Sequence, residues 1–304
     1  MKKILITGAT GFIGSNLCRR LVKEGHEVHI FSRFGTGFWR IKDLADKIKI
    51  WGVDLTDKYS VQKSINKINP QIIYHFAANE ASPLRENANK DILINIIGTW
   101  NLLQSLSNCN YELFLNAGSS SEYGFKDCSM RENDLLEPNS FHSFGKCSQT
   151  LLCQTCAVVD KKPIVNLRLF SVYGPYERKT RLIPMVINNT LNDIPLNLSH
   201  PEVVRDFIYV DDVVDLCVDY KRFLPFSGEI FNIGTGIQST IKEVVDTVFD
   251  LTGKFVGCNW QKNNRIWDTN KWVANTFKSS RDLKFVHSTN LRDGLRKTIE
   301  WTKK

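Results

Sequence analysis

The sequence has no long apolar run and none of the biased composition of fibrous or disordered chains. No apolar stretch approaches the roughly 20 residues that a membrane-spanning helix needs. Nine prolines and eighteen glycines are scattered singly, which excludes collagen-like, linker-like and disordered interpretations. The apolar start of the chain is interrupted at Thr7-Gly8, so we predict no secretion signal. We therefore expect a folded cytoplasmic protein.

Cysteine spacing and charge exclude further classes. The eight cysteines are irregularly spaced and predict reduced thiols rather than a disulfide framework. Cys153 and Cys156 have the spacing of metal ligands, but no second Cys or His pair accompanies them, so we predict no metal site. The formal net charge is +8, yet the basic residues are spread out, which argues against nucleic acid as a partner. This charge would also suit a small anion such as a nucleotide diphosphate.

Apolar β-rich segments alternate with helical periodicity over the first 170 residues of the 304-residue chain. Strands are predicted at 3–7, 27–32, 47–53, 71–78, 111–118 and 163–170, and the main helices at 61–68, 91–106 and 141–159. This order predicts an α/β fold with a Rossmann-type doubly wound parallel sheet. Prolines break up the later segments and indicate a smaller C-terminal substrate lobe. We assign 1–170, with return segments at about 207–236, to a dinucleotide-binding domain, and 171–206 and 237–304 to the lobe.

Three glycines lie between the first predicted strand and the first helix. The first glycine permits a tight turn, the second lets the backbone approach a pyrophosphate, and the third lets helix and strand pack closely. The helix N-terminus adds unpaired N–H groups and the positive end of the helix dipole. This turn predicts a dinucleotide cofactor held by Gly8, Thr10, Gly11, Phe12, Ile13 and Gly14.

The end of the second predicted strand distinguishes the two nicotinamide cofactors. A carboxylate there binds the ribose 2′-hydroxyl of NAD, whereas a small polar residue followed by Arg accommodates a 2′-phosphate. Ser32 and Arg33 occupy these positions. We therefore favour NADP(H), and NAD(H) stays possible if Arg33 is only a solvated loop residue.

Eight motifs in order resemble the extended short-chain dehydrogenase/reductases of the NAD-dependent epimerase/dehydratase family, which act on nucleotide sugars. They are TGATGFIG (7–14), GVDL (52–55), HFAA (75–78), NIIGT (95–99), SSSEYG (119–124), RLFSVYGP (168–175), RDFIYVDD (205–212) and FNIGTG (231–236). The resemblance covers the whole chain and implies a nucleotide-diphosphate sugar as substrate. It also implies further cofactor contacts at Asp54, Leu55, Phe76, Ala77, Ala78, Asn95, Lys146 and Phe170.

The family's chemistry uses a Ser or Thr together with a Tyr four residues before a Lys. The resemblance places these roles at Ser119, His142 and Lys146, so that a histidine stands where the family has tyrosine. An alternative alignment puts Phe144 in that place and Ser148 in place of the lysine, which would leave no acid/base. His142 would otherwise be a helix-face histidine in a site that has lost proton transfer.

The resemblance also suggests the reaction and the substrate contacts. Dehydratases of the family have a carboxylate directly after the catalytic Thr, where this chain has Ser120 and Ser121, with Glu122 one place late. A 4-keto-6-deoxy sugar reductase is therefore favoured, with a C4 epimerase and a non-catalytic NADP sensor as alternatives. Substrate contacts are expected from Ser120, Ser171, Arg205 and Arg265. Arg205 would grip the diphosphate, unless it is a structural arginine paired with Asp206 or Asp211. A homodimer is expected through the apolar helices at 91–106 and 141–159.

Overall fold

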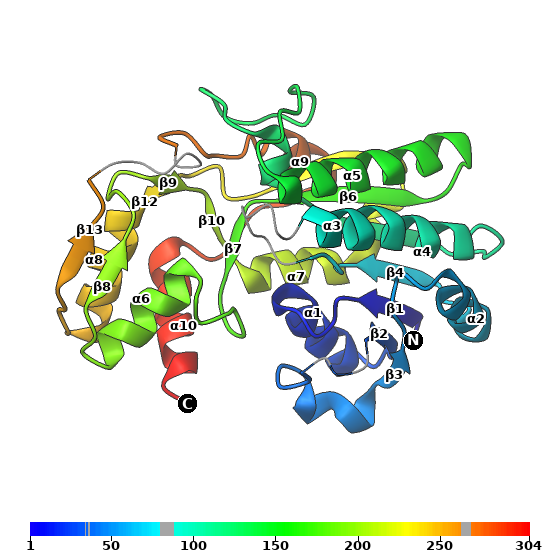
Figure 1. The fold of residues 1–304 in the computed structure, drawn as a ribbon, viewed down its shortest axis with the longest axis horizontal. Coiled ribbons are helices and arrows are strands. Elements are labelled where there is room, and N and C mark those ends of the chain that lie inside the picture. Colours follow the sequence, from blue (N-terminus) through cyan, green and yellow to red (C-terminus); the bar gives the residue numbers. More distant parts are fainter. Residues whose placement is uncertain (34, 36, 80–87, 263–268) are drawn as a thin grey trace. The chain divides into compact units, whose positions relative to one another are not determined.

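The computed structural model describes residues 1–33, 35, 37–79, 88–262 and 269–304 (Figure 1). The chain forms two compact units. Unit 1 comprises Met1–Gly124, Leu135–Arg168 and Val214–Phe231, and unit 2 comprises Phe125–Asp134, Leu169–Val213 and Asn232–Lys304. The functional labels of the two predicted domains stay a prediction.

A sheet of seven strands, within the described residues, forms the centre of unit 1 in the order β11-β6-β5-β4-β1-β2-β3. The pairs β1–β2, β2–β3, β1–β4 and β4–β5 are parallel, so the predicted doubly wound parallel sheet is confirmed. The strands of this sheet are β1 (Lys3–Thr7), β2 (Glu27–Ser32), β3 (Lys49–Gly52), β4 (Ile72–His75), β5 (Leu113–Ser119), β6 (Ile164–Leu169) and β11 (Ile230–Ile233).

Strand order reverses at β1. The chain runs outward from β1 through β2 to β3, and then crosses back to β4 on the other side of β1. The side chain of Ile4 in β1 is flanked by Val28 in β2 and Ile72 in β4, and all three are buried because helices cover both faces of the sheet. In open α/β sheets the ligand binds outside the carboxyl ends of the strands at such a reversal.

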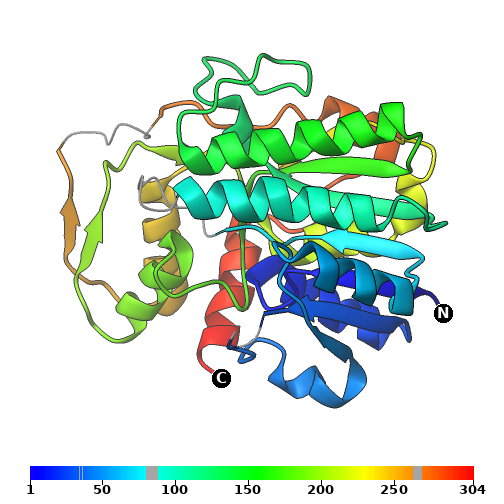
Figure 2. The same ribbon diagram turned by 45° about the vertical axis from the view of Figure 1, so that its right-hand side comes forward.

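The helices of unit 1 form two layers, and Figures 1 and 2 show α2, α4 and α5 side by side on one face. Val61 of α2, Leu102 of α4 and Cys153 of α5 belong to one buried cluster with the strands beneath. On the other layer, Arg20 of α1 pairs with Asp215 of α7. The helices of these layers are α1 (Phe12–Lys23), α2 (Lys58–Ile68), α4 (Thr99–Ser105), α5 (Phe141–Val159) and α7 (Val210–Val218), with short helices η1 (Lys42–Lys47), η4 (Ser120–Tyr123) and η5 (Tyr220–Phe223).

The helix predicted at 91–106 consists of three segments. A short α-helix, α3 (Ala88–Asp91), leads into a π-helical stretch, η3 (Ile92–Gly98), before α4 begins. Gly98 lies against Leu55, and a Cβ there would be 3.0 Å from the Leu55 Cβ. π-Helical stretches are rare and often lie at functional sites. Asp91, directly before this stretch, and Asn95 within it lie against Gly145 of α5.

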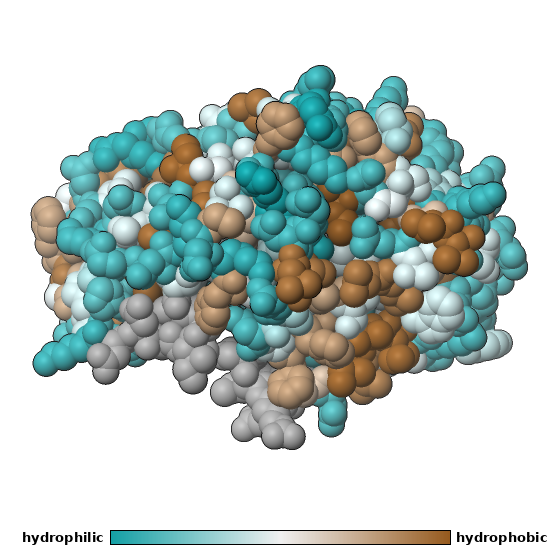
Figure 3. Space-filling model, turned by 90° about the horizontal axis from the view of Figure 1, so that it is seen from above, coloured by the Kyte–Doolittle hydropathy of each residue, from teal (hydrophilic) through white to brown (hydrophobic). Residues whose placement is uncertain are grey.

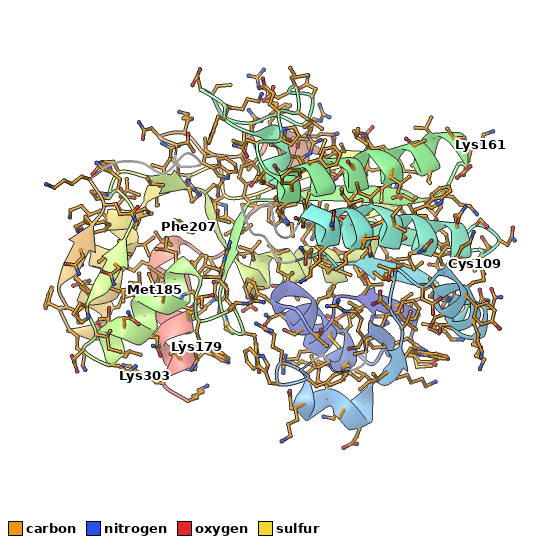
Figure 4. All side chains as sticks on the ribbon, viewed as in Figure 1. Cys109, Lys161, Lys179, Met185, Phe207 and Lys303 are labelled. Atoms are coloured by element: carbon orange, nitrogen blue, oxygen red, sulfur yellow. The ribbon has the colours of Figure 1, made fainter. Side chains whose placement is uncertain are left out.

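Unit 2 has its own apolar core. Buried side chains of α6 (Leu182–Leu191), α8 (Ile241–Thr252) and α10 (Leu291–Thr302) pack with β8 (Leu196–Leu198), and Met185 and Phe207, labelled in Figure 4, pack against this cluster. The remaining elements that unit 2 contributes are β7 (Ser171–Tyr173), β9 (Val204–Arg205), β10 (Phe207–Tyr209), β12 (Ser239–Thr240), β13 (Cys258–Trp260) and α9 (Phe277–Leu283). Across both units, no helix in the described part of the chain is long and apolar enough to span a bilayer.

Candidate active site

The glycine turn joins β1 to α1 at the strand-order reversal. Gly8 has φ +76°, and a Cβ on it would lie 2.5 Å from the Ala77 backbone nitrogen. A Cβ on Gly14 would collide with the Gly8 carbonyl oxygen, and Gly11 N–H donates to that same oxygen at 2.9 Å. Only glycines fit at positions 8 and 14, and the turn leaves the start of α1 with backbone N–H groups available to an anion. The geometry fits the pyrophosphate of a dinucleotide.

Other predicted cofactor residues follow the carboxyl ends of neighbouring strands. Ser32 ends β2 and is buried, whereas Arg33 beside it is exposed. Asp54 follows β3, and its carboxylate accepts hydrogen bonds from the backbone N–H and the hydroxyl of Thr56. Further predicted positions in unit 1 are Leu55 after β3, Phe76, Ala77 and Ala78 after β4, and buried Asn95 in η3. Phe170 belongs to unit 2.

The three predicted proton-transfer residues come from the end of β5 and the start of α5. Ser140 caps α5 by accepting a hydrogen bond from Ser143 N–H at 3.1 Å, so His142 lies in the first turn and Lys146 in the second. Lys146 is buried and its ammonium donates to the carbonyl oxygen of Ala117, two residues before Ser119. The Ser119 hydroxyl accepts from Ser121 N–H and so caps the short helix η4.

Lys146 continues into a chain of buried hydrogen bonds that ends at β1. Its ammonium donates to Gln149 Oε1 at 2.6 Å, which turns the Gln149 amide nitrogen toward His75 Nε2 at 2.9 Å. His75 Nε2 is then an acceptor, and Nδ1–H donates to the Thr7 hydroxyl at 2.6 Å. Burial lowers the pKa of His75 to about 3, which agrees with a neutral ring. Sequence analysis missed Gln149, although its spacing of three residues from Lys146 on one helix was a usable signal.

Glu122 is a structural residue in this arrangement. Its side chain is buried and pairs with Arg168 at 2.9 Å, while its other oxygen accepts from Ser119 N–H and the Thr150 hydroxyl. Arg168 also donates to the Tyr123 hydroxyl. With these bonds in place, the Glu122 carboxylate is committed to holding η4 and β6 together.

A second carboxylate, which sequence analysis missed, lies beside His142. Asp91 Oδ1 is 3.7 Å from His142 Nδ1, within the range of an ion pair and beyond that of a hydrogen bond. The Asp91 side chain is fully buried, and Asn79 donates to its Oδ1 at 3.1 Å. The usable signal was a lone acid at the start of an otherwise apolar helix.

The predicted substrate residues are divided between the two units. Ser120 is buried in η4 of unit 1, while Ser171 and Arg205 belong to unit 2. The guanidinium of Arg205 lies 5.4 Å from the Trp272 ring centre and donates to the Val204 carbonyl oxygen. The Asp206 carboxylate accepts from the backbone N–H groups of 235, 236 and 274. Arg265 lies outside the described residues.

Fold and site together define a dinucleotide-binding α/β protein. A serine at the carboxyl end of β5 is followed by a histidine and a lysine at the start of α5. The model of the NAD dependent epimerase/dehydratase family matches residues 4–234, and the chain belongs to this family. It is an enzyme family whose members act on nucleotide sugars.

Curated relatives and solved structures match over nearly the whole chain. Protein CapI of Staphylococcus aureus is 27% identical, with 98% of each chain covered, and the uncharacterized UDP-glucose epimerase YtcB of Bacillus subtilis is 28% identical, with 98% and 97% covered. The crystal structure of UDP-glucuronic acid 4-epimerase from Bacillus cereus, in complex with UDP-glucuronic acid and NAD, superposes with a TM-score of 0.89 at 28% identity, covering 99% and 98% of the chains.

Proposed function

We propose that this protein is an NAD(P)-dependent 4-epimerase of a UDP-linked sugar, in which His142 exchanges the proton of the sugar hydroxyl. The observation that carries the proposal is the engagement of Glu122 by Arg168, Ser119 N–H and Thr150. Because Glu122 is engaged in this way, residues 119–124 offer a serine hydroxyl for reversible oxidation at a hydroxyl carbon. They offer no free carboxylate for an elimination. The epimerase names of several relatives support the same direction.

The chemistry needs a base for one half of the cycle and an acid for the other. When bound, the nicotinamide ring takes up a hydride and returns it. In the oxidative half, the neutral imidazole of His142 accepts the hydroxyl proton as the C–O bond becomes C=O. Reduction of the carbonyl from its opposite face gives the epimer, and His142 returns its proton to the oxygen. A histidine has an ordinary pKa near 6.5, so it serves both halves near neutral pH.

Neighbouring groups would hold the reacting oxygen and the cofactor. The Ser119 hydroxyl is proposed to donate to the developing oxyanion. Lys146 has its pKa lowered to about 8 by burial, while the nearby Glu122 carboxylate opposes that shift. We assign to it the ribose of the cofactor. Arg205 is proposed to hold the diphosphate, because a guanidinium pairs with phosphate oxygens in a bidentate manner.

The test is incubation of the purified protein with UDP-glucuronate or UDP-glucose and NAD, followed by NMR detection of the C4 epimer. We expect an epimer without net accumulation of reduced cofactor. His142→Ala should lower turnover by about 10²–10⁴-fold. His26→Ala is the matched control, because His26 lies at the opposite, amino end of β2 and should leave turnover unchanged. Nucleotide binding without turnover on any UDP-sugar would instead support the non-catalytic sensor.

A second candidate is the 4-keto-6-deoxy sugar reductase, favoured by Ser32 and exposed Arg33 at the end of β2. A reductase would consume NADPH in proportion to its 4-keto substrate, whereas an epimerase returns its cofactor unchanged.

Cofactor choice can be measured separately from the reaction. We predict that NADPH binds more tightly than NADH, and that Arg33→Ala erodes this preference by about 1–3 kcal/mol, the scale of a hydrogen bond to a charged group. Calorimetric titration with both cofactors measures it. Lys23→Ala, a charge loss on exposed α1 surface, is the control. Equal affinities in the unmutated protein would contradict the prediction.

A further inference from the structure

The side chains around the first turn of α5 place one buried carboxylate against the imidazole of His142. Asp91 ends α3, where the chain turns into the π-helical segment, and its Oδ1 is 3.7 Å from His142 Nδ1. Neither Asp91 oxygen reaches water, because the side chain is fully buried. Among the described residues, Asp91 Oδ2 has no hydrogen-bond partner. A buried carboxylate with an unused oxygen calls for a nearby cation or donor.

Packing holds the two groups together. Gly145 of α5 faces Asn95 of η3, and a Cβ there would lie 3.0 Å from Asn95 Nδ2. The Asn95 amide oxygen accepts from Asn79 N–H at 2.9 Å, while the Asn79 side chain donates to Asp91. This close approach of η3 to α5, one turn from His142, fixes where the Asp91 carboxylate can point. His142 Nδ1 is itself buried, while the side chain as a whole keeps 14% exposure.

We propose that Asp91 is a positioning residue for His142: its carboxylate faces Nδ1, stabilises the imidazolium, and leaves Nε2 to exchange the proton with the substrate. This inference rests on the proposed function of His142. In the oxidative half, the O–H bond of the sugar hydroxyl breaks and an N–H bond forms at Nε2. The positive charge that results on the ring lies opposite the Asp91 carboxylate, and the return of the proton to the oxygen removes it.

Among the described charged residues on the elements around this turn, Asp91 is the anion beside His142. The elements that pack most closely against α5 are η3, β5, η4, α3 and α4. Among their described residues, η3, β5 and α4 carry no charged side chain, and η4 carries Glu122, which is engaged by Arg168. From α3 come Asp91 and exposed Lys90, and α5 itself carries Lys146, whose ammonium points to Ala117 and Gln149. Burial raises the pKa of Asp91, so its carboxylate gains from a cation beside it.

NMR titration of the His142 imidazole in the full chain tests the pairing without any substrate. The His142 signal is assigned by its loss in His142→Ala. In Asp91→Asn we expect the titration midpoint of His142 to fall by about one pH unit, the effect of removing an opposite charge at this range. Asp160→Asn removes the same charge at the far end of α5, about 27 Å along the helix, and should leave the midpoint unchanged. If the Asp91→Asn variant does not fold, the Asp91→Ser variant removes the same charge and is titrated in its place.

A midpoint within about 0.2 pH unit of wild type in a folded Asp91 variant overturns the pairing. Turnover supplies the second readout. Asp91→Asn should slow the His142 enzyme about 10-fold and a His142→Tyr enzyme less than 2-fold, because tyrosine does not need the carboxylate to hold a charge. Equal losses in both backgrounds would make Asp91 merely structural. If no UDP-sugar is turned over, the proposed function fails, while the NMR result still decides whether Asp91 and His142 form a pair.

Discussion

The role of each residue in this site depends on which side chains are buried next to it. His142 and Lys146 are four residues apart on α5, a spacing that can bring two side chains of a helix together. The structure directs the Lys146 ammonium to Ala117 and Gln149, and it places the Asp91 carboxylate at His142 instead. At the same scale, Glu122 is a partner of Arg168 and not a free acid.

The buried imidazole of His75 makes the stability of the folded protein depend on pH. The folded protein holds His75 neutral because its pKa is lowered to about 3, whereas in the unfolded chain the ring titrates near 6.5. Between these values the unfolded state binds more protons, so stability is present above about pH 6.5 and is lost as the pH falls toward 3. His75 alone should lower the free energy of unfolding by up to about 5 kcal/mol over this pH range.

The measurement is the free energy of unfolding by denaturant at several pH values between 7 and 4. His75→Gln should show a shallower decline with acidification than the wild type, and the half-buried His287→Gln should decline as the wild type does. An unchanged slope in His75→Gln would mean that the buried ring does not resist protonation.

Helix α5 carries the predicted proton-transfer residues and is connected to the central sheet by hydrogen bonds. Its inner side carries Lys146 and Gln149, and the chain of hydrogen bonds from them reaches Thr7 in β1, directly before the glycine turn. Cys109 and Lys161, labelled in Figure 4, follow the carboxyl ends of α4 and α5, which lie at the same side of unit 1.

This chain of contacts predicts opposite results from two substitutions of one residue. Gln149→Leu removes one hydrogen-bond partner each from the Lys146 ammonium and from His75 Nε2, which keep only the Ala117 carbonyl oxygen and the Thr99 hydroxyl. The loss of a buried hydrogen bond to a charged group should cost about 2–3 kcal/mol of unfolding free energy. Gln149→Glu keeps an acceptor for Lys146 and gives His75 Nε2 an acceptor, so stability should fall less on acidification than in the wild type. Denaturant unfolding at pH 7 and pH 5 measures both effects.

Gln154→Glu, the same substitution further along α5, is the control for added charge and should leave the acid response unchanged. A Gln149→Glu protein that is more sensitive to acid than the wild type would contradict the assigned direction of these hydrogen bonds.

The whole molecule presents an apolar surface on unit 1. Exposed apolar side chains lie on η3, α4 and the outer side of α5, and Figure 3 shows apolar residues gathered on the face seen from above. They are Ile92, Leu93, Ile97, Trp100, Phe144 and Leu151. Contiguous exposed apolar surface of this kind marks interaction sites. We expect a second copy of this chain to cover this surface. The same homodimer is expected from the apolar sequences at 91–106 and 141–159.

Sedimentation velocity at micromolar concentration tests the expected homodimer. The unmutated protein should sediment as a dimer, and the double variant Leu93→Glu with Leu151→Glu as a monomer, because two charges would be buried in the interface. Ile50→Glu, which adds a charge on exposed edge strand β3, should stay dimeric. A monomeric wild type would refute the prediction.

Local sequence determined the elements and the cofactor turn, because their causes lie within a few residues. Backbone sterics require the glycines at 8 and 14, and α5 occupies the predicted 141–159 because Ser140 caps it and its apolar side repeats with the helical period. Tertiary structure decided which side chains meet. Glu122 and Arg168 are 46 residues apart, Gln149 and His75 are 74 apart, and Asp91 reaches His142 only where the π-helical segment packs on α5. Such contacts depend on how separate elements pack, and no spacing within one element encodes them.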